Sequence, residues 1–309
     1  MSQSKAFRIL ILPSGGATGI IPAALLAALE QKTGRPTHLL FDEIWCSSIG
    51  SVIAALLTHP GFKRHSHSPL SAEEVTHFLI SIFSSCRSAL RIRETLRRAW
   101  PHLADPQLKD TLIPMKILAA EVTKRWGPWP KATQLKTFST QETPQVNLLD
   151  AVSASCTVFP FHWKLTQVHS LTSPHGLYLD AGCEVCTESC MNPFAVFGPT
   201  LEAKARELPI SLYFFSNGWV RWDETHRLHS GAHPVRLFNL DTSLESIWKK
   251  WKKTTRLGRV MRPVNHPRIL QNLTGAGALP PSLLIEHAQG LTSAQAFRQV
   301  VDSLLSNPP

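Results

Sequence analysis

The chain has 309 residues, 43% of them hydrophobic, and a formal net charge of +10. This hydrophobic fraction is enough to build a core and excludes disorder of the whole chain. The longest apolar runs, such as Ile20–Leu29, are shorter than the about 20 residues that cross a bilayer, so we expect no transmembrane helix. The first residues lead directly into a strand-like segment, so we expect no signal peptide. These features predict a cytoplasmic or peripheral membrane protein, and export without a cleaved signal stays open.

Strand-like and helix-like segments alternate at the start of the chain. Residues 7–12 read as a buried strand, and residues 20–31 as a helix that begins after a glycine-rich turn. A second strand is predicted over 38–45 and a second helix over 51–58. Because each strand leads into a helix, the pattern is typical of a mostly parallel α/β sheet.

Further elements are predicted along the rest of the chain. Ser71–Glu74 is a capping box that opens a helix toward Cys86, and Trp126–Lys131 is turn-rich and predicts a loop. The other predicted helices cover 89–100, 148–155, 244–251 and 293–305, and the other predicted strands cover 115–121, 177–179, 208–215 and 235–240.

The first chemical signal is the turn Ser14–Gly19, which lies between a strand and a helix. Its glycines allow backbone N–H groups to point at a phosphate or at the oxyanion of an acyl-transfer intermediate. Gly16–Gly19 also matches the last four positions of the dinucleotide fingerprint G-x-G-x-x-G, with Asp42 near the distance expected for its acid. Ser14 occupies the place of the first glycine, however, so nucleotide binding is the weaker alternative, beside a purely structural turn.

The second signal is Cys46–Gly50 (Cys-Ser-Ser-Ile-Gly), which follows the second predicted strand. It approximates the nucleophile elbow G-x-S-x-G, in which small neighbours allow a strained serine backbone. Only one strand precedes the elbow strand, which argues against the usual α/β-hydrolase order and its distant histidine. None of the 14 histidines lies in a recognisable catalytic setting.

These two motifs, with a later Asp180-Ala181-Gly182, together resemble those of patatin-like phospholipases. That family has the patterns D-G-G-G-x-R-G, G-x-S-x-G and D-G-[GA] in this order. Segments that flank the motifs agree as well, and the resemblance covers about residues 7–195. The similar flanking segments are Phe41–Ile44, Val52–Leu56, Ala151–Ser155, Phe159–Pro160 and Asn192–Pro193.

The resemblance implies a three-layer α/β/α patatin-like fold with a mostly parallel central sheet. We expect a single domain over residues 1–309, in which 196–309 complete the sheet and add C-terminal helices. The implied function is a serine lipid acyl hydrolase, similar to a phospholipase A or a lysophospholipase, with phospholipids or other fatty acyl esters as substrates. Ser48 would be the nucleophile, Asp180 the general base, and Gly15 and Gly16 the oxyanion hole, with no cofactor and no metal.

Five residues depart from the family patterns. Pro13 and Ser14 replace an aspartate and a glycine, Thr18 replaces the arginine, Cys46 replaces the first elbow glycine, and Ala181 replaces the glycine after the aspartate. Because these positions lie around the reacting groups, the alternative is a catalytically weak or inactive module that binds lipid or a partner.

Basic residues concentrate in one segment. Residues 249–262 contain four lysines, three arginines and no acid. Trp248 and Trp251 lie on one predicted helix face with Leu244 and Ile247, which is typical of a membrane interface. Trp248–Arg262 is therefore a candidate for peripheral contact with an anionic membrane; the alternative is a surface helix whose apolar side packs on the core.

Two other partners are not expected. No nucleic-acid module is visible, so the positive charge does not predict nucleic-acid binding. Cys183, Cys186 and Cys190 form one cysteine cluster, but a zinc site would require a fourth ligand from elsewhere.

Overall fold

The computed structural model describes residues 6–63, 66–84, 92–103, 105–126, 129–157, 166–167, 176–181, 193–216, 235–242 and 279–306. Several features named above lie outside the described residues. These are the predicted helix over 244–251, the basic segment to Arg262, the three-cysteine cluster, Gly182 of the third motif, and the flanking residues Phe159, Pro160 and Asn192.

Within the described residues, eight strands form one mixed sheet in the order β5-β6-β3-β2-β1-β7-β8, and β4 pairs with β3. Neighbours from β3 through β2, β1 and β7 to β8 are parallel, whereas the pairs β3–β4, β3–β6 and β5–β6 are antiparallel. The mostly parallel sheet is confirmed. The strands are β1 (Phe7–Leu12), β2 (Glu43–Ser47), β3 (Met115–Trp126), β4 (Trp129–Ser139), β5 (Thr166–Gln167), β6 (Leu177–Asp180), β7 (Ile210–Ser216) and β8 (Val235–Asp241).

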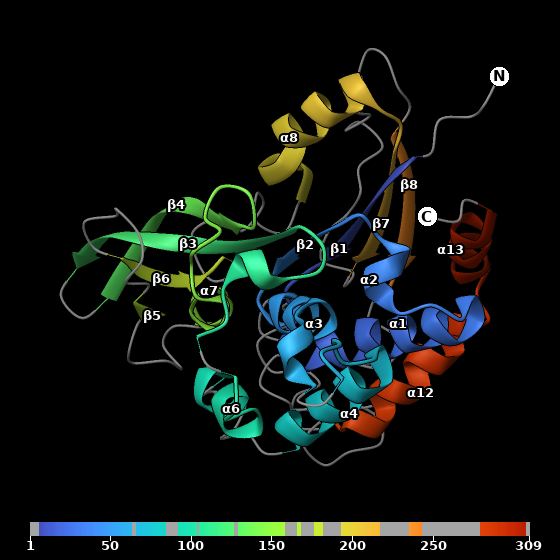
Figure 1. Cartoon of the computed structure of the whole chain (residues 1–309), viewed down its shortest axis with the longest axis horizontal. Coiled ribbons are helices and arrows are strands. Elements are labelled where there is room, and N and C mark those ends of the chain that lie inside the picture. Colours follow the sequence, from blue (N-terminus) through green and yellow to red (C-terminus); the bar gives the residue numbers. More distant parts are fainter. Residues whose placement is uncertain are drawn as a thin grey trace, which may run out of the picture.

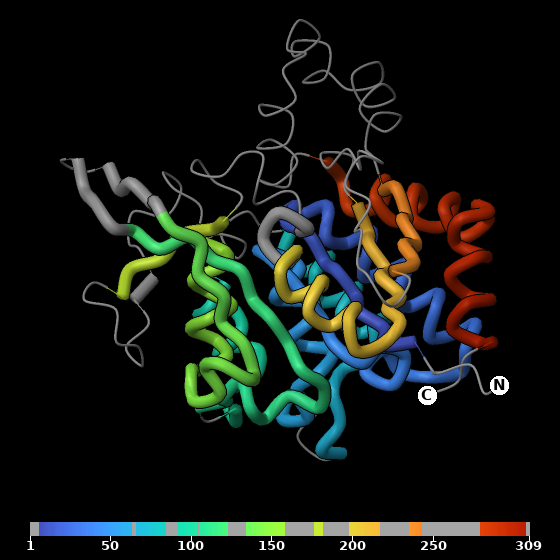
Figure 2. Tube along the Cα trace, turned by 90° about the horizontal axis from the view of Figure 1, so that it is seen from above, coloured from blue at the N-terminus to red at the C-terminus, as the bar shows by residue number. Residues whose placement is uncertain are grey.

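Helices cover both faces of the sheet, with α8 on one face and most of the others on the opposite face (Figure 1). The α-helices are α1 (Ile20–Thr33), α2 (Thr37–Leu40), α3 (Ile49–Thr58), α4 (Ala72–Phe83), α6 (Ile92–Ala99), α7 (Leu148–Ser155), α8 (Pro193–Glu207), α12 (Pro281–Thr292) and α13 (Gln295–Ser306). Figure 2 shows the C-terminal helices beside the N-terminal part of the chain, and α12 and α13 both contact α1.

The two faces of β1 divide the core. Ile9 and Ile11 pack in the smaller hydrophobic cluster with Leu201 of α8. Leu10 and Leu12 belong to the larger cluster beneath the other helices. This alternation follows from the two-residue period of a strand. It gives the three-layer α/β/α architecture that the sequence predicted.

Two predicted elements were wrong. The strand expected over 38–45 is split: Thr37–Leu40 form α2, and β2 begins only at Glu43. The Glu30 carboxylate accepts hydrogen bonds from the N–H and the hydroxyl of Thr37, both at 2.7 Å, and an acid there stabilises the start of a helix.

The loop expected over Trp126–Lys131 is also wrong at its described residues. β3 extends to Trp126 and β4 begins at Trp129, so these residues belong to an antiparallel hairpin. Within the described residues β4 pairs with β3 alone and is therefore an edge strand. Pro130 of β4 pairs with Arg125, and proline is tolerated in an edge strand.

Gly50 permits close packing between α3 and β1. A Cβ atom at this position would lie 2.3 Å from the carbonyl oxygen of Leu12. A backbone atom cannot move aside as a flexible side chain can, so only glycine fits here.

We therefore expect Gly50→Ala to lower the free energy of unfolding by about 3 kcal/mol or more, because the added methyl overpacks a backbone contact. Gly290→Ala in α12 is the matched control, since a Cβ there meets nothing within 4 Å. The control should stabilise the protein by about 0.5–1 kcal/mol, the usual gain of alanine over glycine in a helix. Urea unfolding measures both, and equal stabilities of the two variants would contradict the packing argument.

Candidate active site

Ser48 occupies the sharp turn between β2 and α3. It is the N-cap residue of α3 with φ 52° and ψ −127°, a backbone conformation that residues other than glycine rarely adopt. Such a conformation costs about 1–3 kcal/mol and persists only where the surroundings hold it. Ser48 is 7% exposed, and the Ser51 hydroxyl donates to its carbonyl oxygen at 2.6 Å. The strained turn predicted for a nucleophile elbow is therefore present.

Cys46, which replaces the first elbow glycine, is accommodated in the core. It is buried in the larger hydrophobic cluster. Its thiol donates to the carbonyl oxygen of Lys116 at 3.3 Å. The side chain thus lies in the core on one face of the sheet, and the strained turn forms with cysteine at this position.

β3 brings Ser48 and Asp180 together. Along β3, Leu118 pairs with Ser47 of β2, and the next residue, Ala119, pairs with Asp180 of β6. β4 pairs with this same stretch of β3, so β2 and β6 must share the other edge. β2 and β6 run toward each other along that edge and end at adjacent positions. Consecutive strand residues are about 3.3 Å apart, so the turn at Ser48 begins beside Asp180.

The glycine turn is fastened at two points. Gly16 has φ 55° and opens the short 3-10 helix η1 (Gly16–Gly19), which leads directly into α1. Both the N–H and the hydroxyl of Thr18 donate to the carbonyl oxygen of Gly15, at 3.1 and 2.9 Å. The hydroxyls of Ser14 and Ser47 lie 2.9 Å apart and form a hydrogen bond that links the turn to the elbow. The predicted oxyanion residues Gly15 and Gly16 therefore lie between two anchored positions.

Ser155, the last residue of α7, and the two residues that follow it contact both sides of the junction between β2 and β6. The hydroxyl of Ser155 accepts from the N–H of Ser48, and the carbonyl oxygen of Thr157 accepts from the N–H of Asp180 at 2.8 Å. Between them, the Cys156 thiol lies 3.8 Å from the Ser51 hydroxyl. Sequence analysis placed Ser155 in a small-residue segment but assigned it no role, and it did not single out Cys156 or Thr157.

The Cys156 thiol interacts with groups on both sides of this junction. Burial raises the pKa of the Cys156 thiol, and the negative charge of Asp180 raises this pKa further. Hydrogen bonds of the thiol with Ser51 and Ser48 lower the pKa, but they do not outweigh the burial. One thiol thus interacts with both Ser48 and Asp180.

Asp42 does not occupy the place that nucleotide binding requires. It precedes β2, whereas the fingerprint acid closes the second strand, on the side of the glycine turn. Its carboxylate accepts from the backbone N–H of Arg8 at 2.8 Å and from the guanidinium at 3.4 Å. Asp42 therefore pairs with a neighbouring strand at the opposite end of the sheet.

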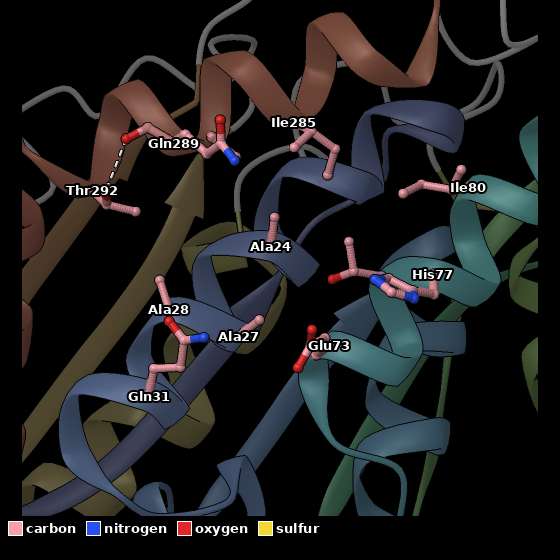
Figure 3. Close-up of a pocket in the computed structure, with 12 residues that line it drawn as sticks. Ala24, Ala27, Ala28, Gln31, Glu73, His77, Ile80, Ile285, Gln289 and Thr292 are labelled. Atoms are coloured by element: carbon pink, nitrogen blue, oxygen red, sulfur yellow. Dashed lines mark hydrogen bonds between the residues drawn. The ribbon is translucent and has the colours of Figure 1, made fainter.

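Other features of the described residues do not add to this site. No helix among them is long and apolar enough to cross a membrane, and no group of three metal-ligating side chains occurs among them. A groove of about 280 Å³ lies between α1, α4 and α12, lined by residues such as Ala27, His77 and Gln289 (Figure 3). Neither Ser48 nor Asp180 lines it.

Comparisons with known proteins point to one family. The sequence model of patatin-like phospholipases matches residues 10–187, more than half of the chain. A cUMP-AMP-activated phospholipase of Escherichia coli is 28% identical over 158 residues, which are 50% of this chain and 48% of that protein. The human calcium-independent phospholipase A2-gamma is 27% identical over 139 residues, which are 44% of this chain and 17% of that protein.

The chain thus spans about half or less of the length of these relatives. Among solved structures, the type III effector protein ExoU is 13% identical, with a TM-score of 0.31 over 95% of this chain and 54% of that one. At this TM-score the likeness indicates nothing about function.

The raised thiol pKa values predict slow alkylation of Cys46 and Cys156 in the folded protein. Burial raises the pKa of both thiols, so the reactive thiolate is scarce at about pH 8, and its amount grows only as the pH rises. We expect iodoacetamide to modify both residues at least about tenfold faster in urea than in the native protein. Peptide mass spectrometry measures the rates, and rapid native labelling that levels off near pH 8 would contradict the raised pKa of these thiols.

Proposed function

This chain belongs to the patatin-like phospholipase family, and on that premise we propose that it is a serine lipid acyl hydrolase that cleaves fatty acyl esters of phospholipids. The observation that carries the proposal is the junction on β3. There Ser47, directly before the strained Ser48 turn, and Asp180 pair with consecutive residues of β3. A nucleophile and a base must lie within hydrogen-bond reach to act together. The head group and the acyl position stay open.

In the proposed first step, the Ser48 hydroxyl oxygen attacks the ester carbonyl carbon, and Asp180 accepts the hydroxyl proton. The carbonyl oxygen becomes an oxyanion that accepts hydrogen bonds from the backbone N–H groups of Gly15 and Gly16. When the tetrahedral intermediate collapses, the alcohol leaves and takes the proton from Asp180. The acyl group is then bound to Ser48 as an ester.

In the second step, water attacks the acyl-enzyme while Asp180 accepts a proton from it. Collapse of this second intermediate releases the fatty acid and returns the proton to Ser48. Asp180 is 3% exposed, so bulk water has little access to the proposed base. The reaction as written requires no metal and no cofactor.

Thr18 supports a working oxyanion turn despite the loss of the family arginine. Its two hydrogen bonds fix the Gly15 carbonyl. In a planar trans peptide the C=O and the following N–H point in opposite directions, so the Gly16 N–H is oriented away from Thr18. A donor that is held before the reaction loses little energy to reorganisation, which favours catalysis over the alternative of an inactive lipid-binding module.

We expect Ser48→Ala and Asp180→Asn each to reduce hydrolysis of phosphatidylcholine in mixed micelles by more than about 10³-fold, because each removes one partner of the proposed dyad. Ser81→Ala and Asp302→Asn are matched controls, since both positions are exposed and lie on α4 and α13. Fatty-acid release measures the effect. Undiminished turnover in either dyad variant would refute the dyad, and no turnover by the folded wild type would favour the binding module.

We also propose that Trp248–Arg262 contacts anionic membrane surfaces, on the sequence evidence of its tryptophans and its +7 charge. Each basic residue near such a surface adds about 1 kcal/mol to binding.

Replacing Lys249, Lys250, Lys252 and Lys253 by glutamine should therefore weaken binding to phosphatidylserine-containing vesicles by about 10²–10³-fold. Binding to neutral phosphatidylcholine vesicles is the control and should change little. Vesicle co-sedimentation measures both, and unchanged binding to the anionic vesicles would mean that the lysines are only solvated.

A further inference from the structure

The C-terminal end of α7 lies at the junction where β2 and β6 meet. We infer that Ser155 is a positioning residue, whose hydroxyl holds the backbone of Ser48 in the conformation needed for nucleophilic attack. This inference rests on the proposed function, because it assigns Ser155 a part in that reaction through Ser48. Ser155 itself need not touch the substrate.

The hydroxyl of Ser155 connects two strands. It accepts from the N–H of Ser48 at 2.7 Å and donates to the carbonyl oxygen of Leu118 in β3 at 2.6 Å. A serine hydroxyl carries one donor hydrogen and two acceptor lone pairs, so both bonds can form at the same time. Ser155 is 0% exposed, and no bulk water can substitute for it.

This bridge begins where the backbone ladder ends. The β2–β3 pairing stops at Ser47 and Leu118, and the positive φ of Ser48 turns the chain away from β3. The Ser155 hydroxyl bridges the Ser48 N–H and the Leu118 carbonyl oxygen. The first group directly follows the last paired residue of β2, and the second belongs to the last paired residue of β3. Without it, the N–H of a buried residue would lose its partner, and the strained turn would lose a contact that holds it.

The same end of α7 is also attached to the proposed base. Two residues after Ser155, the carbonyl oxygen of Thr157 accepts from the N–H of Asp180 at 2.8 Å. The segment Ser155–Thr157 therefore holds the backbones of both Ser48 and Asp180. α7 itself is anchored by the Asn147 cap and by an ion pair between Asp150 and Arg93 of α6.

Ser155→Ala tests the role of Ser155, with Ser139→Ala as its matched control. Ser139 is also fully buried, and its hydroxyl also accepts from a backbone N–H, that of Glu142 at 2.9 Å, but it lies at the end of β4 and not at the junction. We expect Ser155→Ala to lower kcat for phosphatidylcholine by about 10²-fold with little change in KM, because a small misplacement of a reacting group has effects of this size. Ser139→Ala should keep the wild-type kcat, although its melting temperature should be similar to that of Ser155→Ala.

Hydrogen exchange supplies a readout that does not depend on activity. Exchange of the Ser48 amide, followed by NMR, should be at least about tenfold faster in Ser155→Ala than in Ser139→Ala. Ser155→Cys keeps the shape of the side chain, with a somewhat larger atom that forms weaker hydrogen bonds, and it should fall between wild type and Ser155→Ala in both kcat and exchange. This variant maintains the test if the alanine variant does not fold.

The outcomes separate the two proposals. An active wild type together with an equally active Ser155→Ala, or unchanged exchange of the Ser48 amide, would overturn the role of Ser155 alone. A folded wild type without any ester hydrolysis would overturn the proposed function, and with it the catalytic role of Ser155, even if the exchange result were as expected.

Discussion

Ser48 adopts a backbone conformation that costs a serine about 1–3 kcal/mol, and contacts from several elements keep it there. Ser51 donates to its carbonyl oxygen, Ser155 accepts from its N–H, and Gly50 lets α3 approach the end of β1. At Gly50 the absence of a side chain is essential, because a Cβ atom there would lie 2.3 Å from the carbonyl oxygen of Leu12. These contacts around the elbow serve one requirement, which is to hold Ser48 on a turn that would otherwise relax.

β3 organises the site because two strands share one of its edges. Parallel strands deliver their C-terminal ends to the same side of a sheet, and this places the glycine turn after β1 beside the elbow after β2. The antiparallel β6 runs the opposite way along β3 and ends where β2 ends, so that Asp180 arrives beside Ser48. The mixed character of the sheet is thus what brings the proposed nucleophile and base together. α7 then connects both of them from one face.

Sequence reasoning predicted the glycine turn and the elbow, because each follows a strand and uses small residues that a local pattern reveals, and the family resemblance added Asp180 at the end of a predicted strand. Residues 7–12 and 148–155 coincide with β1 and α7 for the same reason. It did not predict α2, whose first residue is held by the carboxylate of Glu30 on the preceding helix, a side-chain contact that the pattern of apolar residues over 38–45 does not reveal. Nor could it predict the part of Ser155, whose partners are 107 and 37 residues away in the chain. Local patterns and the family resemblance point to the proposed reacting groups, whereas the contacts that position them arise only in the folded chain.

The central claim is that Ser48 is an activated nucleophile, and covalent labelling tests it most directly. A fluorophosphonate reacts with a serine only where a base and an oxyanion site activate the hydroxyl. We expect one equivalent of probe on the native protein, mapped by mass spectrometry to Ser48, and none after denaturation or in Asp180→Asn. A folded protein that stays unlabelled, or that is labelled at another serine, would contradict the claim.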